Sequence, residues 1–311
     1  MASKSENEDS WGVTREIDIT YRLLIGNWLH FVVTYYVTLF TRLLAHQSSV
    51  TGRQAAEVIT VCLPFSLITA YQFEIANQTT SPTEDKYNKP YRPIPAGLLT
   101  MKQARRRWFL SSVLTPTMFF FYVGTEAAGW ACLAQACITF FNVWPAFNHV
   151  LCRNAFKGAI SIPLHRSLNL LSVKVAPELW LPLVADLILA FWLSSTIHMQ
   201  EFRDIEGDRH ANRKTLPIFL SSQAMRVVQT FTGGVLIVFS GFAIAWAMQF
   251  PWALNKPLIW AAQLQLAASF NLPLHLIRSK DLTKYTYHYY YYVTFWTVDF
   301  FVVTAAYALK P

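Results

Sequence analysis

The stretch LWLPLVADLILAFWLSSTIHM, residues 179–199, is followed without a break by QEFRDIEGDR, residues 200–209. The first part is apolar and has the length, about 20 residues, that a helix needs to cross a lipid bilayer. The second part carries Glu201, Asp204 and Asp208 at spacings of three and four residues, which would place them on one face of a continuing helix. The junction predicts a membrane helix that ends in an acidic site.

Other apolar runs of similar length recur along the chain, and the whole chain is 53% hydrophobic and 14% charged, where soluble domains carry about a quarter charged residues. A weaker run, Gly158–Val175, contains His165, Arg166 and Asn169, which in a span usually face a protein interior or a wet cavity. Counting it as the fifth helix, we predict an all-α polytopic membrane protein with nine transmembrane helices around a central cavity. The other eight are Leu23–Leu44, Ala55–Ala76, Trp108–Gly124, Gly129–Leu151, Leu179–Met199, Val227–Met248, Pro257–Ile277 and Tyr287–Leu309.

The distribution of Lys and Arg predicts the orientation of these helices. The side that holds the N-terminus and the connections after the second, fourth, sixth and eighth helices carries 20 of them, and the other side carries 5. Positive residues favour the cytosolic side, so the cavity and the connections that follow the second and the sixth helices should face the cytosol. In a eukaryote this predicts the endoplasmic reticulum membrane.

The polar residues 1–15 are predicted to be a disordered cytosolic N-terminus, and residues 16–311 a single transmembrane domain. The net charge of +8 follows from the membrane topology. The chain is therefore expected to contact the lipid bilayer, with no nucleic acid and no protein partner.

A second polar cluster follows the predicted second helix. It reads NQTTSPTED, residues 77–85, and continues as KYNKPYRPIPAG, residues 86–97. Asn77, Ser81 and Asp85 are four residues apart, so a continuing helix would present them on one face. Both clusters lie on the predicted cytosolic side, which places them at the mouth of one bundle.

Two opposed sets of acids suit the chemistry of a diphosphate. Mg²⁺ prefers oxygen ligands and usually takes one or two carboxylates together with phosphate oxygens. Metal ions held in this way neutralise the diphosphate and make it a leaving group. Arg and Lys interleaved with the acids can bind the remaining phosphate oxygens.

The two clusters resemble the motifs of the UbiA prenyltransferase superfamily. The first is similar to its NDxxDxxxD motif followed by NxPxRPIPxG, and the second to DxxDxEGD, with DxEGDR complete at Asp204–Arg209. The resemblance implies a nine-helix UbiA-like bundle that binds a prenyl diphosphate with Mg²⁺. It implies catalytic roles for Asp85, Asp204 and Asp208, metal ligation by Asn77, Asp85, Glu201, Asp204 and Asp208, and diphosphate binding by Arg92, Arg209, Arg22, Lys86 and Arg203.

The motifs depart from the family pattern at several positions. Gln78 and Ser81 stand where prenyltransferases usually carry Asp, and Glu201 replaces the first Asp of the second motif. Glu84, Ser81 and Glu206 are possible compensating ligands. A degenerate first motif with an intact RPIPxG resembles the fungal UbiA-type terpene cyclases.

This resemblance implies a magnesium-dependent intramembrane cyclase that ionises geranylgeranyl diphosphate, in preference to farnesyl diphosphate, and closes it on itself. The alternative is an aromatic prenyltransferase that transfers the prenyl group to a phenolic or quinone-precursor acceptor. A non-catalytic transporter or assembly protein with the same bundle is a third hypothesis. The charged residues inside the predicted helices, Arg166, Asp186 and Asp299, and the neighbouring His165 are either functional groups or members of buried ion pairs.

Overall fold

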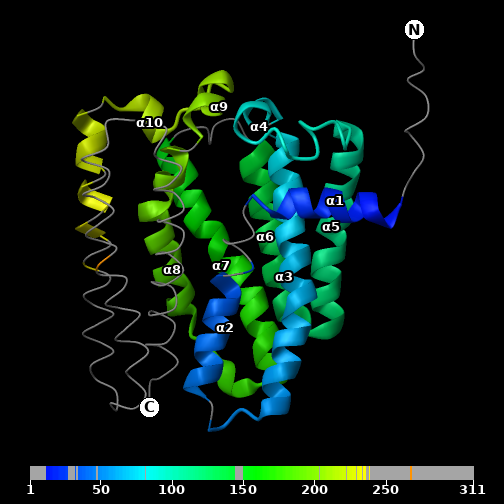
Figure 1. Ribbon diagram of the computed structural model, residues 1–311. Coiled ribbons are helices and arrows are strands. Elements are labelled where there is room, and N and C mark those ends of the chain that lie inside the picture. Colours follow the sequence, from blue (N-terminus) through cyan, green and yellow to red (C-terminus); the bar gives the residue numbers. More distant parts are fainter. Residues whose placement is uncertain are drawn as a thin grey trace.

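The structure is a computed structural model that describes residues 12–26, 32, 34–46, 48–80, 82–143, 150–202, 204–221, 223–228, 230–232, 234–235, 238 and 267. Every regular element within these residues is a helix. The long helices run side by side along one axis (Figure 1). They are α2 (Thr34–Ala45), α3 (Gly52–Thr80), α5 (Met101–Tyr122), α6 (Thr125–Val143), α7 (Val150–Val175) and α8 (Leu183–Thr196).

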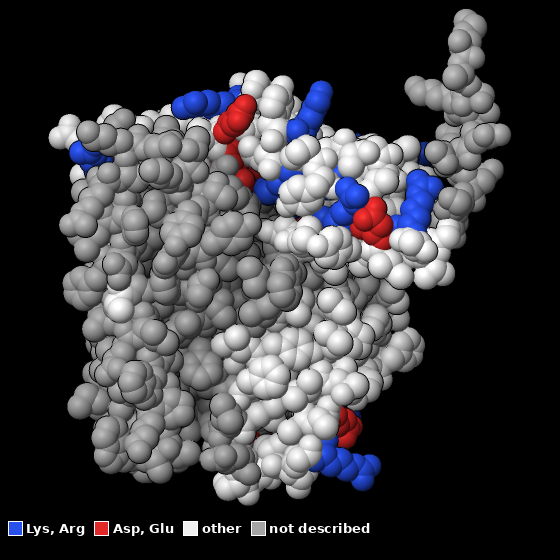
Figure 2. Space-filling view, in the orientation of Figure 1, with Lys and Arg blue, Asp and Glu red and all other residues white. Residues whose placement is uncertain are grey.

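Short helices gather at one end of this bundle (Figure 1). They are α4 (Pro82–Asn88), α9 (Ile205–His210) and α10 (Leu216–Phe219), whereas α1 (Val13–Leu24) lies across the long helices near the same end. Two 3₁₀ turns flank α8, namely η3 (Pro177–Leu179) and η4 (Ile197–Phe202). Figure 2 shows Lys, Arg, Asp and Glu gathered at the end with α4 and α9, with a smaller group at the opposite end.

The predicted helical runs that lie mostly within the described residues correspond to structural helices, except at the N-terminus. The weak run Gly158–Val175 is the second part of α7, which is continuous over 26 residues. Within the described residues, two helices, Gly52–Thr80 and Leu183–Phe202, are long and apolar enough to cross a membrane. The predicted spans Pro257–Ile277 and Tyr287–Leu309, and most of Val227–Met248, lie outside the described residues.

The N-terminal region differs from the sequence prediction. A first membrane span was predicted over Leu23–Leu44, but Leu23 belongs to α1, which ends at Leu24 and is followed by a turn at residues 25 and 26. Helix α1 also begins at Val13, within the stretch 1–15 predicted to be disordered. Apolar residues recur on two sides of α1, which a composition-based search for long apolar runs does not detect as a separate helix.

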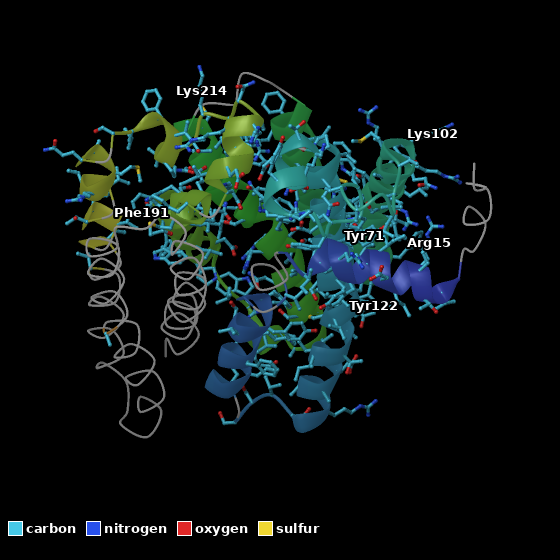
Figure 3. All side chains as sticks on the ribbon, turned by 45° about the horizontal axis from the view of Figure 1, so that its top comes forward. Arg15, Tyr71, Lys102, Tyr122, Phe191 and Lys214 are labelled. Carbon is cyan, nitrogen blue, oxygen red and sulfur yellow. The ribbon has the colours of Figure 1, made fainter. Side chains whose placement is uncertain are left out.

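One side of α1 packs on the bundle and the other faces outward. Ile19 and Leu23 are fully buried in a cluster with Ile75 of α3 and Ala104 of α5. The opposite side exposes Val13, Ile17 and Tyr21, each four residues from the next. The ion pair between Arg107 and Glu16, at 2.7 Å, connects α1 to α5, and Tyr71 of α3 lies beside α1 in Figure 3.

Helices α7 and α8 approach each other closely at Gly158. A Cβ atom at this position would overlap the backbone oxygen of Ala190 and the side chain of Ser194. Small residues at such crossings let two helix backbones come together, which is how membrane helices commonly pack. The same α7 also contacts α3 and α6, so it lies at the centre of the bundle.

Candidate active site

A cavity of about 180 Å³ lies among α3, α7 and α8 and reaches the end of the bundle that carries α4 and α9. Its apolar walls are formed by Phe73, Phe156, Ile160, Leu164, Leu168, Leu189, Leu193 and Ile197. Its charged and amide side chains are Asn77, Glu84, Lys89, Arg153, Lys157, Gln200, Glu201, Asp204, Asp208 and Arg213. An apolar chamber with a charged mouth suits a molecule with an apolar chain and a charged head group.

Asn88 joins the two short helices at the mouth. Its side-chain N–H donates to the backbone oxygen of Asp204 at 2.9 Å, and its side-chain oxygen accepts from the backbone N–H of Gly207 at 2.9 Å. A Cβ atom at Gly207 would overlap this amide. The rings of Tyr87 and His210 stack at 3.7 Å between the same two helices. These contacts set the distance between the first and the second acidic cluster.

Acids from the two acidic clusters pair with the same cationic side chains where α4 meets α9. Lys89 Nζ lies 3.3 Å from Asp204 Oδ2 and 3.6 Å from Glu84 Oε1. Arg213 pairs with Glu84 and, at 3.4 Å, with Asp208. The mouth is therefore a network of alternating charges that two distant segments of the chain build together.

Glu201 meets two cations of α7. Its Oε1 atom lies 3.7 Å from Arg153 Nε and 3.8 Å from Lys157 Nζ, beyond hydrogen-bond range. Both Glu201 Oε1 and Arg153 Nε are buried and have no hydrogen-bond partner among the described residues. Because buried polar atoms are rarely left unsatisfied, this arrangement leaves room for a charged ligand between them.

The acids at the mouth differ in the direction in which their pKa is shifted. Burial, together with the nearby Glu84 carboxylate, raises the pKa of Asp208 to about 6. Burial acts in the same direction on Glu84, but Arg213 and Lys89 outweigh it and lower the pKa of Glu84. Crowded, buried carboxylates of this kind gain from a bound cation, which favours their charged form.

The comparisons with known proteins identify the family. Residues 31–298 match the profile of the UbiA prenyltransferase family. The chain belongs to the UbiA prenyltransferase family. Members of this family are integral membrane proteins.

Several characterised members of the UbiA family are similar in sequence. Diterpene cyclase eriG of Hericium erinaceus is 32% identical over 173 residues, which is 52% of this chain and 51% of the relative. Polyprenyl transferase eriF of the same organism is 29% identical over 164 residues, which is 52% of this chain and 54% of the relative. The chain thus aligns with about half the length of these two relatives. Somaliensene A/B synthase of Streptomyces somaliensis is 26% identical over 215 residues, 69% of each chain.

Solved structures share the fold. The UbiA homolog from Archaeoglobus fulgidus bound to GPP and Mg²⁺ superposes with a TM-score of 0.60 at 14% identity, covering 91% of this chain and 99% of that one. The structure of digeranylgeranylglyceryl phosphate synthase superposes with a TM-score of 0.58 at 12% identity, covering 95% and 99%. At these identities the likeness concerns the UbiA fold alone.

Within this UbiA fold, the cavity brings together part of the predicted site. Of the predicted metal ligands, Asn77, Glu201, Asp204 and Asp208 line it, and so does Glu84, a predicted compensating ligand. Asn77 lies on α3, Glu84 on α4, Glu201 on η4 and Asp208 on α9, and Asp204 directly precedes α9. Both acidic motifs therefore contribute to the cavity.

Two predicted site residues lie elsewhere. Arg92 is fully buried and pairs with Asp85 at 2.9 Å and with Glu74 at 2.8 Å. None of the three lines the cavity. The structure thus places Asp85 and Arg92 in a buried ion network behind the cavity wall, because α4 turns Asp85 away from the neighbouring Glu84.

The remaining predicted residues are on the outside or are not described. Arg22 pairs with Asp18 at 2.8 Å on α1 and donates to the backbone oxygen of Tyr91. Lys86, Glu206 and Arg209 are exposed. Ser81 and Arg203 lie outside the described residues, and so does Asp299, which the sequence predicts to lie within a membrane helix.

Four cations at the mouth were not singled out from the sequence. Lys89 and Arg213 lie inside or just after the two motifs, and Arg153 and Lys157 are one helical turn apart at the start of α7. The sequence did hold a signal for the last two. Arg153 and Lys157 share a helical face with Ser161 and His165, which belong to the run Gly158–Val175. That run is too polar to be expected against lipid, so its polar face indicates a protein interior or a wet cavity.

The cavity mouth has oxygen ligands suited to magnesium. Carboxylates and amides, which offer the oxygen ligands that Mg²⁺ prefers, line it from two sides, and Glu201 Oε1 accepts no hydrogen bond from the part of the chain that the structure describes. Among the described residues no three His, Cys, Asp or Glu side chains already converge as a ligand set. The acids are paired with Lys89, Arg213, Arg153 and Lys157, so the residues fit the ion once these pairs rearrange.

The polar residues within the helices divide into two kinds. Arg166 donates to the backbone oxygen of Leu181 at 2.6 Å and lies 3.4 Å from Asp186, which also accepts from Asn169 at 3.2 Å. These residues form a buried structural network between α7 and α8. His165, in contrast, lines the cavity.

Proposed function

We propose that this chain is a magnesium-dependent terpene cyclase that ionises a prenyl diphosphate and cyclises it with loss of diphosphate. The observation that carries the proposal is one cavity with an apolar chamber and a mouth lined by acids and cations. The site would lie within an integral membrane protein and face the cytosol, in the endoplasmic reticulum membrane if the organism is eukaryotic.

The residues of the mouth divide the work of binding the head group. Lys89, Arg153, Lys157 and Arg213 supply the positive charge that phosphate oxygens require. Asn77, Glu84, Glu201, Asp204 and Asp208 would hold magnesium. Bound magnesium neutralises the diphosphate and makes it a better leaving group.

The apolar chamber would protect the cation that forms. When the bond between the allylic carbon and the diphosphate oxygen breaks, its electron pair leaves with the diphosphate. Phe73 and Phe156 present rings to the cavity and can stabilise positive charge by cation–π attraction. The aliphatic walls exclude water, so the cation reacts with double bonds of its own chain.

The relatives favour this chemistry over its rival. Diterpene cyclase eriG and Somaliensene A/B synthase are cyclases or synthases by name, and the Archaeoglobus fulgidus homolog was solved with GPP and Mg²⁺. The diterpene cyclase supports geranylgeranyl diphosphate over farnesyl diphosphate as the substrate. The alternative is transfer to a phenolic or quinone-precursor acceptor, which the similarity to polyprenyl transferase eriF supports.

Gas chromatography of a heterologous host that makes only its own C15 and C20 diphosphates tests the proposal. We expect a new cyclic terpene that disappears with Asp208→Asn and, in isolated membranes, with excess chelator. Absence of any terpene, combined with a prenylated product once phenolic acceptors are added, would establish the prenyltransferase instead.

A further inference from the structure

The cavity also contains a few hydroxyl groups away from its charged mouth. Among the described residues, the hydroxyl side chains that line the cavity are Ser66, Thr69 and Ser161. Thr69 precedes Asn77 of the mouth by eight residues on α3, so at 1.5 Å per residue it lies about 12 Å further along the helix. A polar group at this depth faces the hydrocarbon chain of a bound prenyl diphosphate and not its head group.

The Thr69 hydroxyl differs from the other two in its hydrogen bonding. Ser66 and Ser161 donate to backbone oxygens of their own helices, at 2.9 Å and 2.6 Å, which is a common way for a hydroxyl within a helix to satisfy its donor. Thr69 is 3% exposed, and its hydroxyl has no hydrogen-bond partner within the described part of the chain. Because buried polar atoms are rarely left unsatisfied, this hydroxyl is available to a small polar molecule in the cavity.

Water is the molecule that suits this position. The hydrocarbon chain of a prenyl diphosphate has no group that can form a hydrogen bond with Thr69. A buried water needs two or more polar partners and a cavity larger than itself, and the cavity of about 180 Å³ has the room. Ser66 lies one helical turn from Thr69 on the same face of α3, and its oxygen can accept from the water because its own hydrogen is donated to Leu63.

We propose that Thr69 is the positioning residue for a water molecule that ends the cyclisation, so that the product is a cyclic terpene alcohol. The inference rests on the proposed cyclase function. After ring closure has moved the positive charge away from the head of the chain, the water oxygen donates an electron pair to the cationic carbon and forms a C–O bond. The bound oxygen then loses one proton, which the diphosphate released in the same cavity takes up. One prenyl diphosphate and one water thus yield one cyclic alcohol and one diphosphate.

A single positioned water is compatible with a chamber whose walls otherwise exclude water. Water at the mouth would capture the allylic cation as soon as the diphosphate leaves, and the product would be an acyclic alcohol with its oxygen on the first carbon. Water held by Thr69 meets only carbons that lie deep in the cavity. The oxygen is therefore expected on a ring carbon several bonds from the carbon that carried the diphosphate.

The experiment compares the wild type with Thr69→Val, Thr69→Ser and Thr115→Val. Valine keeps the shape of threonine without its hydroxyl, and serine keeps the hydroxyl. Thr115 is the matched control because it is also buried, but its hydroxyl donates to the backbone oxygen of Ser111 at 2.8 Å and it does not line the cavity.

Membranes receive the prenyl diphosphate and Mg²⁺ in water enriched in a heavy oxygen isotope. Diphosphate release, cyclic alcohols and cyclic alkenes are measured, together with the isotope content of the alcohols. Thermal unfolding in detergent reports whether each variant is folded. Thr69→Val should fold, because a buried hydroxyl without a partner does not stabilise the protein.

We expect the wild type to make a cyclic alcohol that carries the heavy oxygen. Thr69→Val should release diphosphate at the rate of the wild type but lower the ratio of cyclic alcohol to cyclic alkene about tenfold, because the water loses a hydrogen bond that holds it. Thr69→Ser and Thr115→Val should keep the ratio of the wild type.

Two results would overturn the role of Thr69 and leave the cyclase function intact. They are a wild type that makes only cyclic alkenes, and an unchanged ratio of alcohol to alkene in folded Thr69→Val. Equal loss of diphosphate release and of alcohol in that variant would also contradict the role, since it would show general damage to the site. If Thr69→Val does not fold, Thr69→Ala takes its place with the same expected ratio. A wild type that makes no cyclic product would instead refute the proposed function.

Discussion

Lys157 and Lys174 are two lysines on the same helix with different surroundings. Lys157 lines the cavity near Glu201, and Lys174 is exposed at the other end of α7. The same contrast separates neighbours in the first acidic motif, where Glu84 lines the cavity and Asp85 pairs with Arg92 behind it. The role of a charged residue here depends on the side of its helix, which a motif pattern does not resolve.

Replacement of Lys157 by Met should weaken binding of the prenyl diphosphate. A hydrogen bond to a charged group contributes about 1.5–3 kcal/mol, so KM should rise roughly tenfold or more. Lys174→Met removes the same charge from the same helix and should leave KM unchanged. Steady-state kinetics in isolated membranes measures both, and equal effects of the two variants would contradict a binding role for Lys157.

Replacement of Arg92 by Met should damage the folded protein itself. Arg92 lies between Glu74 and Asp85, all three buried, and burial already raises the pKa of Asp85 despite Arg92. Removing the cation leaves buried acids uncompensated, which costs about 3–5 kcal/mol.

Thermal unfolding in detergent measures this loss, with the exposed Arg105→Met as the control. A variant with wild-type stability and only a raised KM would return Arg92 to the role predicted from the sequence, that of a diphosphate ligand.

At the scale of elements, the joint between α4 and α9 determines the geometry of the mouth. These helices have seven and six residues, too few to be stable alone, so their positions come from contacts such as those of Asn88 with Asp204 and Gly207. The long helices α3, α7 and α8 supply the walls.

Gly207→Ala should therefore reduce activity more than stability. The added methyl group overlaps the Asn88 amide and pushes α9, with Asp208, away from Glu84. A displacement of about 1 Å can cost roughly 10²-fold in rate, which we expect to see in kcat. Gly129→Ala is the matched control, because its Cβ would meet open space in α6. Wild-type turnover by Gly207→Ala would show that the joint does not set the site geometry.

At the scale of the whole molecule, most of the visible charged residues and the mouth of the cavity lie at the same end of the bundle. The charged end in Figure 2 is the end at which α4 and α9 close the cavity. Helix α1 crosses α5 near this end, close to the level where exposed residues change from Arg105 and Arg106 to Phe109 and Leu110. That change is expected where a helix passes from the aqueous phase into lipid.

The orientation can be tested with single cysteines in a background whose exposed Cys132 is replaced by Ala. Cysteines that replace Lys102 and Lys214, both at the α4–α9 end (Figure 3), should be labelled from the cytosolic side by a membrane-impermeant thiol reagent. Arg53, at the start of α3, should be labelled only from the other side. Labelling of Lys102 and Lys214 from opposite sides would contradict the predicted topology.

Much of this protein was determined by local sequence. The length and composition of runs such as Ala55–Ala76 required helices in an apolar solvent, because a backbone in lipid must satisfy its own hydrogen bonds. The motif at Asp204–Arg209 indicated the family, and two of its acids, Asp204 and Asp208, line the cavity, whereas Glu206 is exposed. Even the polar run Gly158–Val175 was correctly assigned as a helix, and its polar residues indicated an interior surface.

Only the tertiary structure decided which charged residues face the cavity. Asp85 and Arg92 lie inside a conspicuous motif yet form a buried network, whereas Arg153 and Lys157 lie outside both motifs and line the mouth. The reason is that a side chain's surroundings depend on the rotation of its helix against helices distant in sequence. That rotation is set by contacts such as those of Gly158 with α8 and of Asn88 with α9, which no local pattern encodes.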